Sequence, residues 1–281
     1  MSKRIYCLKN ELEALDSLDG DDLAFVYANP ILGSYRNGID AHEARPAYMK
    51  WVCEKLWVIR DAIQTYLKES AIAYPYPYNQ QLRGMHDGAY EDAVAEKEIV
   101  RGIMNFQRQG KSIKNHFREA SKVCEIIDYE VPMFCLKGGR VSGRKIDAVG
   151  RSVGTQGDRL YIYEAKANRS PETLLRCLME AFSYSLLVDR VRFKVSFGVR
   201  QNTTIVLSPL IFEGSVPHRD LRCALSCSEE KSLFDTLLER IRKVANVDVE
   251  FAVVRKTDFI IDGKPVFPNV KDTKFKLEWL D

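Results

Sequence analysis

The first 80 residues carry apolar positions at helical spacing. The pattern is clearest between Ala44 and Ser70, where large apolar side chains recur every three or four residues and so share one face of a helix. These side chains are Trp51, Val52, Leu56, Ile59, Ile63 and Leu67. Prolines at positions 75 and 77 then end any helix, because proline restricts its own backbone and that of its predecessor. We therefore expect an N-terminal helical segment over residues 1–85 and a second domain over residues 86–281.

The second region begins with helical patterns and then changes to strands. A helix is predicted from Gly88 to about Gln109, and a short basic helix from Lys111 to Lys122. Stretches rich in Val, Ile, Tyr and Phe follow, separated by glycine-rich turns, which is typical of strands. Because the connections are short, we expect an antiparallel meander. The predicted strands are Val123–Cys135, Arg144–Arg151 and Arg159–Ala167.

A helix start follows the third strand. Ser170, Pro171 and Glu172 supply an N-cap, a proline at the first position and an acid in the first turn. This helix is expected to reach about Val188 and to form a crossover to a parallel strand that begins at Phe193. The Ser208-Pro209 pair indicates an edge or a bulge. The remaining predicted elements are strands Phe193–Val199 and Thr203–Phe212, helix Glu229–Val244 and strand Val247–Arg255.

The order of these elements predicts an α/β fold. Its mixed sheet would consist of the meander and then the crossover strand, flanked by helices on both faces, with the N-terminal helical segment added.

Composition narrows the class of protein. The chain has 281 residues, of which 46% are apolar and 29% charged, as in ordinary globular proteins. It has no apolar run of the length that spans a membrane and no signal-like start, so no membrane partner is expected. Seven scattered cysteines without a second close pair or a histidine cluster argue against a zinc site, and a cytoplasmic location is expected.

Charge is distributed unevenly along the chain. The net charge is only +3, but residues 137–200 hold 13 Lys/Arg and 6 Asp/Glu, a net +7, which leaves −4 for the rest. A basic middle is what a site facing a polyanion would show. A solvated charged face would show the same distribution.

Two carboxylates and one ammonium are predicted to converge at the end of the meander. Glu164 and Lys166 are two residues apart in a strand, so their side chains point to the same face. Asp147 lies on the preceding strand and can fall beside Glu164. Burying these charges without partners would cost several kcal/mol each. A divalent cation with oxygen ligands would offset that cost, and a phosphodiester is the electrophile that suits basic surroundings.

This arrangement resembles the signature of the PD-(D/E)XK nuclease superfamily, whose core is a helix, a three-strand meander, a helix and a further strand. The resemblance covers about Gly88 to Val206 and implies a restriction-endonuclease-like fold. It implies that Asp147, Glu164 and the carbonyl of Ala165 hold Mg²⁺ or Mn²⁺, and that Lys166 positions the attacking water.

Further residues follow from the same resemblance. The run from Ala95 to Val100 is similar to the start of archaeal junction resolvases and points to Glu96 as a supporting catalytic residue. Ile146 stands where the family has proline, and Glu180-Ala-Phe-Ser-Tyr184 stands where an exonuclease-like branch has Gln-x-x-x-Tyr.

The sequence thus predicts a metal-dependent nuclease, a hydrolase of phosphodiester bonds that acts on DNA. Arg144 and Arg169 are candidates for binding nucleic acid, and Arg176 and Tyr184 could order the site or contact phosphate. The sequence also allows a homodimer. The alternative is a non-catalytic nucleic-acid-binding or interaction protein that keeps a nuclease-like scaffold.

Overall fold

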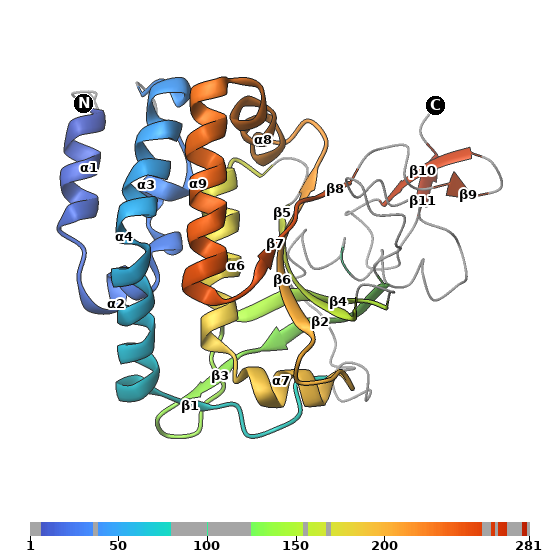
Figure 1. Ribbon diagram of the computed structural model, residues 1–281. Coiled ribbons are helices and arrows are strands. Elements are labelled where there is room, and N and C mark those ends of the chain that lie inside the picture. The colour runs from blue at the N-terminus through green and yellow to red at the C-terminus, as the bar shows by residue number, and fades with distance from the viewer. Residues whose placement is uncertain are drawn as a thin grey trace.

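A mixed sheet flanked by helices forms the centre of the molecule (Figure 1). The computed structural model describes residues 7–35, 39–79, 100, 125–153, 157–166 and 170–254, and the backbone of strands at 260–261, 264–268 and 277–279. Within these residues no helix has the length and apolar character needed to cross a membrane. The predicted helices at 88–109 and 111–122 lie outside the described residues, apart from Val100.

The N-terminal segment is helical, as predicted. Its main element is α4 (Ala41–Ser70), which contains the whole predicted helix and begins with an N-cap in which Asp40 accepts a hydrogen bond from the backbone N–H of His42 at 2.8 Å. Four shorter helical elements precede it, and a short strand follows it. They are α1 (Leu8–Asp16), α2 (Gly20–Ala24), η1 (Val26–Ala28), α3 (Pro30–Gly33) and β1 (Ala71–Ala73).

The predicted meander is confirmed. Strands β2 (Glu125–Pro132), β4 (Lys145–Ser152) and β5 (Arg159–Lys166) pair antiparallel in that order, with Ala148 opposite Tyr163. The segment predicted as one strand up to Cys135 divides after Pro132, and β3 (Phe134–Leu136) pairs instead with β1.

The crossover after β5 also exists, but it leads to a later strand than the one predicted at Phe193, and its helix begins at another N-cap. Helix α6 (Leu174–Leu187) leads to β6 (Thr204–Phe212), which is parallel to β5. The N-cap is Thr173 rather than Ser170, because the Thr173 side chain accepts from the backbone N–H of Arg176 at 3.1 Å.

The predicted strand Phe193–Val199 is wrong. The chain forms helix α7 (Arg190–Ser196) there, capped by Asp189, whose carboxylate accepts from the backbone N–H groups of Val191 and Arg192. The cap and the packing of the buried Phe193 ring against Tyr78 outweigh the strand preference of the Val and Phe residues.

A second crossover completes the sheet. Helices α8 (Val216–Ser226) and α9 (Ser228–Ala245) lead to β7 (Asp248–Val249) and β8 (Ala252–Val254), which both pair parallel with β6. Of the two alternatives predicted for Ser208-Pro209, an edge or a bulge, neither is found, because β6 lies between β5 and β7/β8 and its register does not shift at Pro209. Pro209 lies between the residues of β6 that pair with β7 and those that pair with β8, so its missing N–H removes no hydrogen bond to either of these two strands.

Strands β9 (Ile260–Ile261), β10 (Lys264–Pro268) and β11 (Leu277–Trp279) pair antiparallel.

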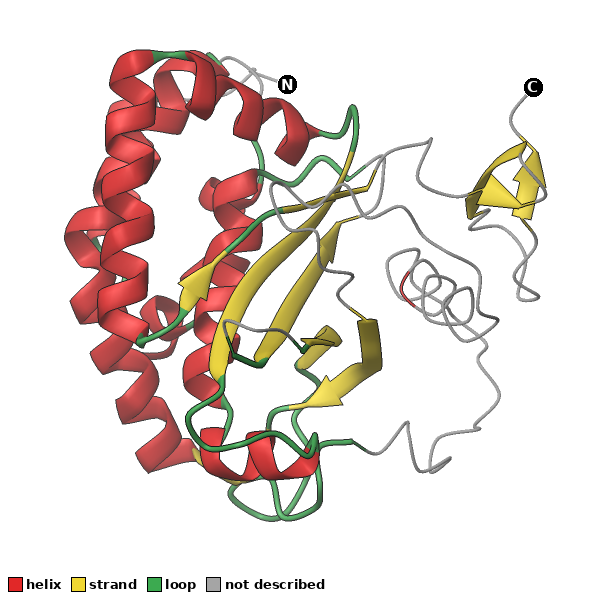
Figure 2. Ribbon diagram, turned by 45° about the vertical axis from the view of Figure 1, so that its right-hand side comes forward, coloured by secondary structure: helices red, strands yellow, loops and turns green. Residues whose placement is uncertain are grey.

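Helices α4, α6 and α9 lie on one side of the sheet (Figure 2), and α6 packs directly on β5 and β6. One core joins these helices to the sheet: Leu56 and Ile59 of α4 belong to the same buried cluster as Leu160 and Ile162 of β5. The division near residue 85 stays a prediction, since it falls outside the described residues.

Candidate functional site

The candidate site lies where β5 ends under α6. The side chains of Leu160 and Ile162 are in the core, and the alternation of the strand places Glu164 and Lys166 on the same face. Both charged residues are buried, Glu164 at 2% and Lys166 at 5% exposure. Their carboxylate and ammonium contact each other, so the predicted pair is present and is desolvated.

Asp147 lies beside this pair, as predicted. It is on β4, next to β5, and its Oδ2 accepts a hydrogen bond from the backbone N–H of Ala165 at 2.8 Å. The Asp147 side chain thus lies against the peptide group between Glu164 and Ala165. The alternation of both strands and the register of the hairpin are sufficient to bring the two carboxyl groups together.

Two further carboxylates reach Lys166, and neither was among the predicted site residues. Lys166 Nζ lies 2.8 Å from Glu172 Oε2, in the segment before α6, and 3.1 Å from Glu180 Oε2, on α6. One signal was available for Glu180, which is four residues before Tyr184 and so on the same face of the helix. The Tyr184 hydroxyl donates a hydrogen bond to Glu180 Oε1 at 2.8 Å.

The electrostatics of the site follow from its burial. Burial and the neighbouring carboxylates of Asp147 and Glu180 raise the pKa of Glu164 well above its ordinary value. Burial alone would lower the pKa of Lys166, but Glu164 and Glu180 raise it above its ordinary value. Burial would likewise raise the pKa of Glu180, but Lys166 and hydrogen bonds hold it below its ordinary value. The surrounding carboxylates therefore favour the charged form of Lys166, whereas burial and two like charges disfavour the ionised form of Glu164.

A metal ion at this site would need carboxylate or carbonyl oxygens as its ligands. Among the described residues, no group of three or more His, Cys, Asp or Glu side chains has the arrangement of a metal centre. Mg²⁺, however, commonly takes one or two carboxylates and keeps several waters. Asp147 and Glu164 could supply those carboxylates, and Oε2 of Glu164 is buried without a hydrogen-bond partner.

The formal charges of the side chains around Lys166 do not balance. Within the described residues, the cluster contains four carboxyl groups (Asp147, Glu164, Glu172 and Glu180) and the cations Lys166 and Arg176, which leaves a formal charge of −2 when all are ionised. This excess of carboxylates is compatible with a divalent cation, and a metal held by Asp147, Glu164 and the Ala165 carbonyl stays a prediction.

The remaining predicted site residues are Glu96 and the four candidates for contact with nucleic acid, and they differ in where they lie. Arg176 forms an ion pair with Glu172 at 3.0 Å, and Tyr184 is buried, so both order the cluster rather than present a free surface. The Arg144 guanidinium lies 3.7 Å from the centre of the Phe25 ring and donates to the hydroxyl of Tyr27 at 3.0 Å. Glu96 and Arg169 lie outside the described residues.

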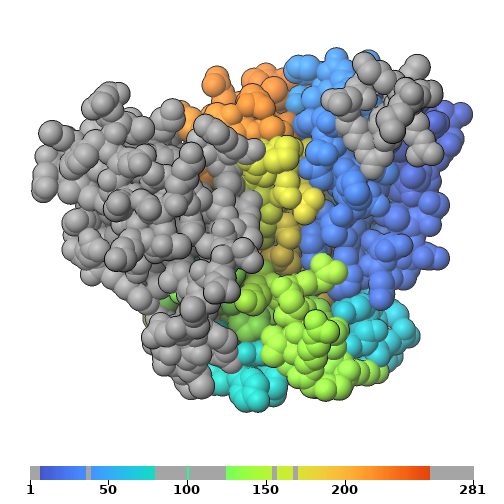
Figure 3. Space-filling view, turned by 180° about the vertical axis from the view of Figure 1, so that it is seen from behind, coloured from blue at the N-terminus to red at the C-terminus, as the bar shows by residue number. Residues whose placement is uncertain are grey.

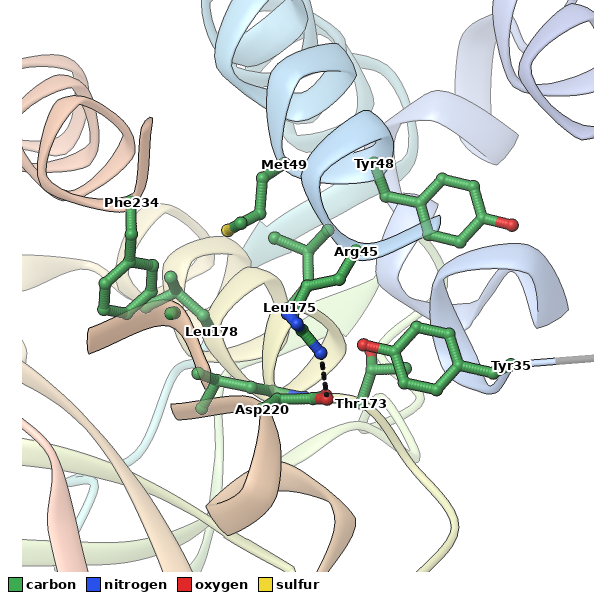
Figure 4. Close-up of a pocket in the computed structure, with 11 residues that line it drawn as sticks. Tyr35, Arg45, Tyr48, Met49, Thr173, Leu175, Leu178, Asp220 and Phe234 are labelled. Carbon is green, nitrogen blue, oxygen red and sulfur yellow. Dashed lines mark hydrogen bonds and ion pairs between the residues drawn. The ribbon is translucent and has the colours of Figure 1, made fainter. Parts of the chain in front are cut away.

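The N-terminal helices hold the start of α6. The backbone N–H of Thr173 donates to the carbonyl of Gly33 at 3.2 Å, and the backbone N–H of Leu174 donates to Asp220 Oδ2 at 3.1 Å. Figure 4 shows the Arg45 side chain, from α4, pointing at Asp220, from α8, at 3.5 Å. This buried pair fixes the helix that carries Glu180.

The segments around the site reach one face of the molecule. Figure 3 shows parts of the chain coloured green and yellow at the surface, beside the N-terminal helices in blue. The chain as a whole matches no protein-family model, no curated protein and no solved structure. The resemblance to the nuclease superfamily therefore stays a prediction, and a functional assignment depends on the residues and geometry described above.

Proposed function

We propose that the chain is a metal-dependent nuclease with a restriction-endonuclease-like core, which hydrolyses phosphodiester bonds of DNA. One observation carries the proposal. Asp147, Glu164 and Lys166 meet at the end of adjacent strands, and Glu164 and Lys166 are almost completely buried there. A purely structural role would not require so many charged groups, because an apolar replacement for a buried ion pair is often as stable.

The charge of the cluster supports a cation as the missing component. With all groups ionised, the formal charge of −2 would repel a phosphodiester, whereas a bound divalent ion makes the site neutral. Such an ion lowers the pKa of a bound water and polarises a phosphoryl oxygen. Asp147, Glu164 and the Ala165 carbonyl would hold it, and Glu96 stays a candidate for support.

Lys166 would then act on the nucleophile. Its ammonium group has three N–H donors and no acceptor, so it can orient a water molecule by donating a hydrogen bond and can stabilise negative charge that develops beside it. The neighbouring carboxylates keep it charged, so its role is to position and stabilise rather than to take up a proton.

Nucleic acid is the substrate class that the charge distribution favours. The net +7 over residues 137–200 surrounds the acidic cluster in sequence and suits a polyanion. DNA is proposed over RNA on the resemblance alone.

A metal titration tests the proposal against the non-catalytic alternative. Calorimetry with Mn²⁺ should give saturable binding to the wild-type chain and none to Glu164→Gln, with Glu239→Gln, an exposed glutamate of α9, as the matched control. If wild type and Glu164→Gln bound Mn²⁺ equally well, the site would not be a metal site, and the scaffold alternative would be favoured.

A further inference from the structure

Lys166 has more carboxylate partners than a water-positioning lysine needs. Its ammonium group contacts Glu164 on its own strand, and it lies 2.8 Å from Glu172 and 3.1 Å from Glu180, which come from the segment before α6 and from α6 itself. One partner therefore belongs to the sheet, and the two others approach from the helix side.

Each helix-side carboxylate is itself held in place. Tyr184 donates to the second oxygen of Glu180 at 2.8 Å, and Arg176 pairs with the second oxygen of Glu172 at 3.0 Å. The Tyr184 ring in turn packs edge to face against Tyr27 of η1, with the ring centres 5.9 Å apart. Both carboxylates thus have partners besides Lys166 that hold them, and Glu180 also shares a hydrogen bond with Glu164.

A cation on Glu164 would change the balance of forces on Lys166. The metal ion and the ammonium have charges of the same sign and would compete for the same carboxylate, so Lys166 would lose part of its attraction to Glu164 and would be repelled by the ion. A long, flexible lysine side chain would then move away unless other groups retained it.

We propose that Glu172 and Glu180 are positioning residues that hold the Lys166 ammonium in place when Glu164 ligates the metal ion. This role rests on the proposed function, because it matters only if a cation binds at Glu164. Neither carboxylate needs to touch the metal ion or the substrate.

Kinetics of isosteric variants test the role. Glu180→Gln keeps an oxygen that can accept from Tyr184 but loses the charge that attracts Lys166. We expect kcat for cleavage to fall by about tenfold or more, the usual scale for losing a group that orients a functional residue. KM should stay within about twofold, and Mn²⁺ affinity within about threefold, because substrate and metal contacts are retained. Glu172→Gln should behave in the same way, and Glu239→Gln should match wild type.

A double-mutant cycle shows whether the effect passes through Lys166. In a Lys166→Ala background, under single-turnover conditions with enzyme in large excess, adding Glu180→Gln should change the residual rate by less than about twofold. If the two effects multiplied, Glu180 would act independently of Lys166 and the proposal would be wrong. A large loss of Mn²⁺ affinity in Glu180→Gln would also overturn it, by making Glu180 a ligand.

A spectroscopic measurement separates this inference from the proposed function. The ¹⁵Nζ resonance of Lys166, assigned by its absence in Lys166→Arg, should remain sharp in wild type after Mg²⁺ is added. It should broaden in the double variant Glu172→Gln/Glu180→Gln when Mg²⁺ is bound, as calorimetry would verify. Broadening in wild type with Mg²⁺, or a sharp resonance in the Mg²⁺-bound double variant, would overturn the positioning role. If calorimetry showed no Mg²⁺ binding to wild type, the proposed function would fail and this role with it.

Discussion

Lys166 is the residue on which the stability of the candidate site depends. Its ammonium group is the cation that contacts Glu164, Glu172 and Glu180 together, in a place where water screens little charge. Removing one charged partner from such a buried cluster lowers the stability by more than the intact ion pair contributes to it, because the remaining charges are left uncompensated.

Lys166→Ala should therefore lower the free energy of unfolding by about 3–5 kcal/mol. The same variant should bind Mn²⁺ at least as tightly as wild type, since an ammonium is not a ligand and no longer competes for Glu164. Mn²⁺ should consequently raise the melting temperature of Lys166→Ala by more than it raises that of wild type. Thermal unfolding with Mn²⁺ or with EDTA measures both effects.

The double variant Glu164→Gln/Lys166→Ala is the control for this prediction and should show no such rise. If Mn²⁺ raised the melting temperatures of Lys166→Ala and of the double variant equally, the ion would be binding elsewhere.

Among the residues of the candidate site, the positions of those on strands could be predicted from the sequence, whereas the positions of those in and before α6 could not. Alternation along a strand fixes the face of Glu164 and Lys166, and a short hairpin brings Asp147 beside them. Glu172 and Glu180 reach Lys166 only through the packing of α6 on the sheet. Helical periodicity predicts which side of α6 is buried, but not which strand position lies beneath each residue.

At the scale of elements, the start of α6 links the N-terminal helices to the site. Arg45 of α4 pairs with the half-buried Glu230 of α9 at 2.8 Å and with the buried Asp220 of α8 at 3.5 Å, and Asp220 accepts from the first N–H of α6. The Arg45 guanidinium thus links α4 to α8 and α9 directly and to α6 through Asp220. Its loss would therefore weaken the contacts that hold α6, the helix that carries Glu180.

Arg45→Met should lower the free energy of unfolding by about 3–5 kcal/mol, because it removes the cation that pairs with the buried Asp220 and the half-buried Glu230. Arg60→Met provides the matched control. Arg60 is on the same helix, but its partner Asp61 is well exposed, and such a pair contributes about 0–1 kcal/mol. Urea unfolding of both variants gives the comparison, and equal midpoints would show that the buried pair does not hold α6.

The boundaries of elements were predicted less well than their existence. Thr173 caps α6 because its side chain and backbone are fixed by residues of α3, with the hydroxyl donating to the Leu32 carbonyl at 2.5 Å. A local pattern cannot show such a contact across the chain, and Ser170 with its following proline was the stronger local signal. Helix α7 was missed for a similar reason, since its packing against the Tyr78 connector is not local.

At the scale of the whole molecule, the basic middle of the chain is the feature that a nucleic-acid partner would contact. Lys137 and Arg140 are exposed in the turn that leads toward Asp147 on β4, whereas Lys50 and Lys231 are exposed on α4 and α9. Both pairs carry the same charge, so reversing either one changes the net charge of the protein equally.

Lys137→Glu with Arg140→Glu should weaken DNA binding by about tenfold or more at low salt, and should flatten the decrease of affinity with salt concentration, because fewer counterions are released. Lys50→Glu with Lys231→Glu should have a clearly smaller effect. Fluorescence anisotropy with labelled duplex DNA across a salt series measures both, and equal losses from the two pairs would remove the argument from charge distribution.

The most direct measurement is cleavage of a mixed panel of DNA and RNA substrates by the wild-type chain and by Glu164→Gln, with Mn²⁺ or with EDTA. Our account predicts that wild type hydrolyses DNA with Mn²⁺, that EDTA stops the reaction, and that Glu164→Gln is inactive although it is folded. No cleavage of any substrate by wild type with Mn²⁺, or equal cleavage by Glu164→Gln, would contradict the assignment of this site to phosphodiester hydrolysis.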